Sequence, residues 1–133
     1  MKIRLLLGIV AVLTVSGGVS AEDLGGAETI LCAGLQATHC DTTGLCETGM
    51  PWDWNMPQFV DIDREAKVVS TPRAVERFRR TPIRTLERST GEIFLQGVEN
   101  ARACRFVTDE TRGVASIAIA ADGHTISVFG ACT

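Results

Sequence analysis

After the short apolar run at its N-terminus, this 133-residue chain has no further apolar run long enough to span a membrane. A transmembrane helix needs about 20 consecutive apolar residues, so we expect no membrane span in the rest of the chain. The chain also lacks the close cysteine pairs of structural zinc sites, a glycine-rich phosphate loop and a local nucleophile–base motif. These absences predict a protein without a metal or a cofactor and favour a non-enzymatic function.

The N-terminus has the three parts of a secretory signal peptide. Basic residues are followed by an apolar run over residues 5–15 and by small residues up to Ala21. We expect cleavage between Ala21 and Glu22, with export to the periplasm or out of the cell. No cysteine stands at the cleavage point to carry a lipid. The mature chain, residues 22–133, is long enough for one domain.

The charge balance of the mature chain is acidic. Loss of Lys2 and Arg4 leaves 11 basic and 16 acidic residues, a net charge of −5. This balance argues against general binding of nucleic acids.

Short β-rich segments separated by turn residues fill the second half of the chain. Short connections join antiparallel neighbours, so these segments predict an all-β meander that forms a curled sheet or a small up-and-down barrel. The expected strands are residues 29–38, 59–62, 67–70, 82–88, 92–99, 101–108, 113–120 and 124–130.

The five cysteines predict two disulfides, because exported thiols meet an oxidising environment. Cys32 and Cys132 lie on the first and last strands, which become neighbours if the sheet closes. Cys40 and Cys46 enclose a five-residue loop with a glycine, which lets the chain turn back. We therefore predict the pairs Cys32–Cys132 and Cys40–Cys46 and a free Cys104.

Two alternatives give these cysteines a role in metal binding or in catalysis. Cys32, His39, Cys40 and Cys46 are competent zinc ligands, but their spacing is poor, and Cys104 with His39 or His124 would form a thiol nucleophile and its base. We favour disulfides over the metal site. We also favour a buried, inert Cys104 over a catalytic Cys104.

Residues 73–88 hold six arginines against two glutamates in an otherwise acidic domain. Guanidinium groups bind carboxylates and phosphates, so this run is a candidate contact for an anionic partner or an anionic envelope surface. The alternative, which we favour, is a solvated strand face that pairs with the acidic residues Asp61, Asp63 and Glu65 across the sheet. The candidate contact residues are Arg73, Arg77, Arg79, Arg80 and Arg84.

Both tryptophans, Trp52 and Trp54, stand between prolines in residues 50–57, which predicts a semi-rigid loop. They either plug the open end of the sheet or form an apolar contact surface, and we favour the plug.

The signal peptide, the early cysteine-rich segment, the "PQFVDID" strand and the terminal "VFGACT" resemble a group of small exported bacterial proteins of unknown function. The resemblance supplies no catalytic residue. We expect a binding or interaction protein of the cell envelope, whose partner is an unknown protein, an anionic surface or a small apolar ligand. A structural or stress-related envelope component and an enzyme are the alternatives.

Overall fold

The computed structural model describes residues 23–72 and 78–133. The predicted signal peptide, residues 1–21, lies outside the described residues, as do Arg73 and Arg77. The described chain contains two short 3-10 helices, η1 (Leu24–Gly26) and η2 (Pro51–Trp54). Its strands are β1 (Thr29–Asp41), β2 (Cys46–Gly49), β3 (Phe59–Asp63), β4 (Val68–Ser70), β5 (Arg80–Ser89), β6 (Glu92–Glu99), β7 (Arg102–Asp109), β8 (Val114–Ala121) and β9 (His124–Cys132).

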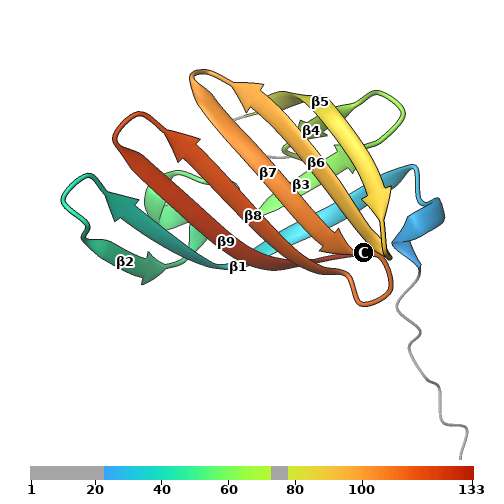
Figure 1. Ribbon diagram of the computed structural model, residues 1–133, viewed down its shortest axis with the longest axis horizontal. Coiled ribbons are helices and arrows are strands. Elements are labelled where there is room, and N and C mark those ends of the chain that lie inside the picture. Colours follow the sequence, from blue (N-terminus) through green and yellow to red (C-terminus); the bar gives the residue numbers. More distant parts are fainter. Residues whose placement is uncertain (1–22, 73–77) are drawn as a thin grey trace, which may run out of the picture.

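Eight of these strands form a closed antiparallel barrel (Figure 1). From β3 to β9 each strand pairs with its successor, and β1 closes the sheet by pairing with β3 on one side and β9 on the other. β2 is an additional strand that pairs with residues 37–40 of the long β1. The predicted all-β meander is therefore confirmed and the sheet closes. β2 is the strand that our sequence analysis missed.

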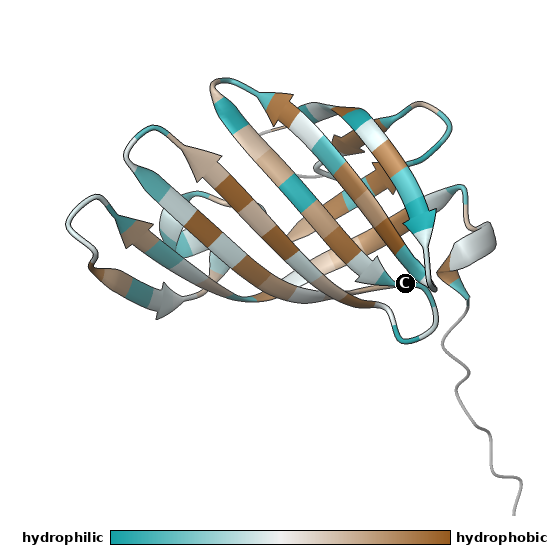
Figure 2. Ribbon diagram, in the orientation of Figure 1, coloured by the Kyte–Doolittle hydropathy of each residue, from teal (hydrophilic) through white to brown (hydrophobic). Residues whose placement is uncertain are grey.

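Side chains alternate between the interior and the outside of the barrel, as the period of two along a strand requires. In β6, Ile93, Leu95 and Gly97 are buried, whereas Gln96 and Val98 are exposed. Figure 2 shows the same alternation of apolar and polar residues along the neighbouring strands. Each fully buried Leu or Ile contributes about 1.5–3 kcal/mol, so this interior stabilises the barrel. Its main cluster is Leu24, Ile30, Cys32, Ile62, Val69, Ile83, Ile93, Leu95 and Phe106.

Two disulfides connect strands that are directly paired. Cys32 of β1 is bonded to Cys132 of β9, its partner in the sheet register. Cys40 of β1 is bonded to Cys46 of β2, again its register partner. Cys104 is free and half-buried. Both pairings confirm the predictions: Cys32–Cys132 followed from barrel closure, and Cys40–Cys46 from the short loop with a glycine.

The helix η1 closes one end of the barrel. Leu24 is only 2% exposed and packs against the core, and its backbone N–H donates to the carbonyl oxygen of Glu110 at 2.9 Å. The carboxylate of Asp23 accepts a hydrogen bond of 2.8 Å from the N–H of Gly25, which caps the helix. Leu24 is therefore held in place as an apolar plug.

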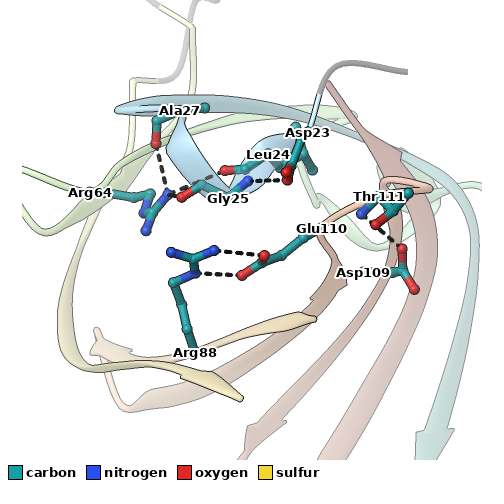
Figure 3. Close-up of polar contacts among 9 residues, drawn as sticks. All are labelled: Asp23, Leu24, Gly25, Ala27, Arg64, Arg88, Asp109, Glu110 and Thr111. Carbon is teal, nitrogen blue, oxygen red and sulfur yellow. Dashed lines mark hydrogen bonds and ion pairs between the residues drawn. The ribbon is translucent and has the colours of Figure 1, made fainter. Parts of the chain in front are cut away.

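Two arginines fix this plug (Figure 3). Nη1 of Arg64 donates to the carbonyl oxygens of Leu24, Gly25 and Ala27 at 3.2, 3.0 and 2.9 Å. Nε and Nη2 of Arg88 donate to the two carboxylate oxygens of Glu110 at 2.5 and 2.7 Å. Glu110 is 8% exposed, and the hydrogen bonds from Arg88 lower the pKa of its carboxyl group. We refer to η1 with these arginines and Glu110 as the closed end.

Candidate functional site: a cavity at the open end of the barrel

A cavity of about 90 Å³ lies inside the barrel, between the core and the end opposite η1. Gly34 stands in its wall, where a Cβ atom would lie 2.9 Å from Cγ of Pro51 and 3.1 Å from Cγ1 of Val128. A larger side chain at this position would intrude on the cavity wall. The other wall residues are mainly apolar: Val60, Val69, Phe106, Ile117, Ile119 and Val128.

The rim of the cavity is polar and carries charges of both signs. Glu99 and Arg102 are register partners at the ends of β6 and β7, and Arg79 precedes β5. The hydroxyl of Thr81 donates to Oε2 of Glu99 at 2.7 Å, and Nη1 of Arg79 donates to the carbonyl oxygen of Asn55 at 3.4 Å. The guanidinium of the half-buried Arg102 forms no hydrogen bond or ion pair with any described residue. Its guanidinium donors are therefore available to a ligand.

The free thiol of Cys104 faces this cavity from β7. Burial raises the pKa of the Cys104 thiol, and the negative charge of Glu99 adds to the rise. A catalytic thiol needs a lowered pKa. Neither His39 nor His124 forms a hydrogen bond with Cys104. The geometry therefore favours a wall residue over a catalytic thiol.

The arginine-rich run is divided by the fold. Arg79 reaches the rim of the cavity, whereas Arg80 and Arg84 are exposed on β5. We expected this run to pair with the acidic residues of β3, but the two strands are not neighbours, because β4 lies between β3 and β5. Ser70 of β4 pairs with Asp61 on one side and with Arg80 on the other. Among the described residues, Arg80 and Arg84 form no ion pair.

The tryptophan loop contains η2 (Pro51–Trp54), which is followed by Asn55 in the left-handed conformation as its C-cap. Trp54 is half-buried, packs against the cluster around Ala37 and Val128, and stacks on His39 with ring centroids 5.7 Å apart. Trp52 is 52% exposed. Of the two tryptophans, only Trp54 therefore packs against the barrel interior, and the expected plug stays a prediction.

Comparisons with known proteins do not assign this chain to a family. No protein-family model, curated protein or solved structure matches this chain. The resemblance to small exported bacterial proteins stays a prediction. Over residues 23–72 and 78–133 we find no helix long and apolar enough to cross a membrane, and no group of three or more His, Cys, Asp or Glu residues placed to hold a metal ion. The function has to be inferred from the cavity and its rim.

One arrangement at the open end was not anticipated from the sequence. His39 of β1 and His124 of β9 lie side by side, with ring centroids 5.4 Å apart. The signal was present in the predicted closure of the barrel, which pairs the first strand with the last.

Proposed function

We propose that this protein is an exported, non-enzymatic binding protein whose barrel takes up the apolar part of a small amphipathic ligand. The observation that carries the proposal is the apolar cavity with the guanidinium of Arg102 at its rim. The acidic or phosphate-bearing head of the ligand accepts hydrogen bonds from Arg102, while its apolar part contacts the cavity walls. Export rests on the predicted signal peptide and is compatible with the two disulfides.

The size of the cavity limits the apolar part of the ligand. A volume of about 90 Å³ has room for roughly three to eight non-hydrogen atoms. Burying five methylene groups contributes about 4 kcal/mol, which alone corresponds to a dissociation constant of about 1 mM. A charged hydrogen bond adds about 1.5–3 kcal/mol when it is shielded from water. Because the rim is half-exposed, we expect the lower end of this range, about a tenfold gain in affinity.

Hexanoate and 1-hexanol test this proposal, because they share a six-carbon chain and differ in the charge of the head group. Cys104 provides the readout, since it is the free thiol in the cavity wall. A bound ligand is expected to slow the alkylation of Cys104 by iodoacetamide. We expect both compounds to protect the thiol, hexanoate at about tenfold lower concentration. If neither compound protects Cys104 and native mass spectrometry of the exported protein detects no ligand, the proposal is wrong.

Two variants on one strand separate the cavity from the outer surface. Ile117→Phe places a larger side chain in the cavity wall, whereas Ala118→Phe places the same side chain on the exposed face of β8. We expect only Ile117→Phe to abolish protection by hexanol. Circular dichroism establishes that both variants are folded, and loss of protection in both would place the ligand elsewhere.

Export is tested separately. N-terminal sequencing of the protein recovered outside the cytoplasm is expected to begin at Glu22. Retention of residues 1–21 in the cytoplasm would contradict export and leave the cavity proposal to be judged by ligand binding.

A further inference from the structure

The two histidines of the chain meet at the open end of the barrel, although 84 residues separate them in the sequence. We propose that His39 and His124 form a binding site for one transition-metal ion that prefers imidazole ligands, such as Cu²⁺ or Zn²⁺. The proposal does not depend on the cavity ligand, because neither His39 nor His124 lines the cavity.

The sheet register positions the pair. Asp41 of β1 is the direct partner of His124 on β9, and His39 lies two residues before Asp41. Residues two apart on a strand share one face of the sheet, so His39 and His124 are diagonal neighbours on the same face. The disulfide from Cys40 to Cys46 constrains the chain between His39 and Asp41. The two imidazoles are thus held close by regular strand pairing.

The distance between the rings suits a shared ion. A zinc–nitrogen bond is about 2.0–2.1 Å long, so each ring centre lies about 3.2 Å from the ion, and two rings at a tetrahedral angle have centroids about 5 Å apart. The observed distance between the centroids of His39 and His124 is 5.4 Å. Binding an ion therefore requires rotation of side chains without displacement of β1 or β9.

The imidazole nitrogens are accessible and unused. Neither imidazole forms a hydrogen bond with a described residue, and the side chains of His39 and His124 are half-buried rather than enclosed. Two protein ligands leave the remaining coordination positions to water. We therefore expect moderate affinity and a site open to solvent, unlike the closed four-ligand sites that stabilise folds.

Negative charge beside the pair favours a cation. The carboxylate of Asp41 accepts hydrogen bonds from the N–H and the hydroxyl of Thr43, at 2.8 and 2.6 Å. Asp41 lies two residues after His39 and is the register partner of His124. Its carboxylate group is therefore a neighbour of both histidines in the sheet.

Trp54 gives the site its own spectroscopic reporter. Its indole stacks on the ring of His39, with an angle of 14° between the ring planes. Cu²⁺ quenches the fluorescence of a nearby indole, so an ion on His39 is expected to quench Trp54. The background variant Trp52→Phe removes the second tryptophan, and Cys104→Ser removes the free thiol that could reduce Cu²⁺.

We would titrate this background variant with CuCl₂ and follow the fluorescence of Trp54. The expected result is saturable quenching by one ion per chain. His124→Asn should weaken the apparent affinity at least tenfold, because one of two imidazoles is lost while the stacking of Trp54 on His39 is kept. Thr125→Ala, on the neighbouring exposed position of β9, should leave the affinity unchanged.

Equal quenching in the background protein and in His124→Asn, or the lack of saturable quenching below about 1 mM Cu²⁺, would overturn the proposal. Electron paramagnetic resonance of the Cu²⁺ complex decides the question without a histidine variant. A signal with two imidazole nitrogen ligands supports the site, and a signal with fewer overturns it.

Discussion

The two ends of the barrel are built from the same strands but use their charged groups differently. At the closed end, Arg88 bonds to Glu110 and Arg64 bonds to three backbone carbonyls. At the open end, Arg102 stands beside an apolar cavity and bonds to no described residue. Charged groups that satisfy one another fix a structure. A charged group with unused donors beside an apolar space is suited to selecting a ligand.

The largest expected effect comes from removing the disulfide between the first and last strands. Its sequence separation is 100 residues, and a loop of that length corresponds to about 4.7 kcal/mol in the chain-entropy model. We expect the double variant Cys32→Ala/Cys132→Ala to lose about 4–5 kcal/mol in free energy of unfolding, measured by urea denaturation.

The matched control removes the disulfide near the open end. Cys40 and Cys46 are six residues apart, so their replacement by alanine should cost about 2 kcal/mol in the same model. Equal losses in free energy of unfolding in the two double variants would show that loop length does not determine how much each disulfide stabilises the protein. Such a result would weaken the contrast between the two ends of the barrel.

The next effect concerns Glu110→Gln at the closed end. Arg88 lowers the pKa of Glu110 in the folded protein, so the folded state binds fewer protons at this group than the unfolded chain. The stabilisation is therefore complete above the unfolded pKa of about 4.3 and is lost as the pH falls through the lower folded pKa. We expect Glu110→Gln to lower the melting temperature at pH 7 and to reduce its dependence on pH below about 5.

Arg112→Gln is the control for this measurement. Arg112 pairs with Asp109 at 2.9 Å, but its side chain is 73% exposed. Exposed ion pairs stabilise proteins little, so the melting temperature at pH 7 should hardly change. A larger loss of melting temperature from Arg112→Gln than from Glu110→Gln would show that burial does not explain the stabilisation by the closed-end pair.

A smaller effect is expected at the tryptophan loop. Trp54→Ala removes a half-buried ring from the cluster around Ala37 and should cost about 1–3 kcal/mol, less than the loss of a fully buried aromatic side chain. Trp52→Ala changes an exposed side chain and should stay within about 0.5 kcal/mol. Urea denaturation followed by circular dichroism compares them without relying on tryptophan emission. Similar losses in free energy of unfolding would contradict the packing of Trp54 against the barrel interior and the exposure of Trp52.

The smallest expected change in stability is that of Arg102→Gln. Because Arg102 bonds to no described residue, its loss should alter the free energy of unfolding by no more than about 0.5 kcal/mol. The same change should remove the roughly tenfold preference for hexanoate over hexanol. Arg84→Gln, on the exposed face of β5, should keep that preference. A large loss of stability in Arg102→Gln would assign this arginine to the fold.

Much of the fold could be predicted because it depends on local patterns. Alternating apolar residues and short turns located seven of the barrel strands in the second half of the chain and β1 before them, and closure then paired Cys32 with Cys132. β2 was missed because its four residues are mostly exposed and lack an apolar alternation. Its position is set by the Cys40–Cys46 disulfide and by pairing with β1.

The candidate site was predicted only in fragments. The arginine run and the barrel interior were separate hypotheses, and the structure joins them where Arg79 meets the cavity rim. Arg102, which carries the proposal, was not singled out, because a lone arginine at a strand end has no distinctive pattern. The Arg88–Glu110 pair was also missed, since its partners are 22 residues apart and meet only through the turns of neighbouring hairpins.

Closure of the sheet by β1 and β9 also determines when the protein can fold. Cys132 of β9 follows Cys32 of β1 by 100 residues in the sequence. During the export that we propose, Cys32, Cys40 and Cys46 therefore emerge together before Cys132. In an oxidising compartment Cys32 can then form a wrong disulfide with one of its two near neighbours, so correct maturation favours either late oxidation or an isomerase that reshuffles the first bonds formed.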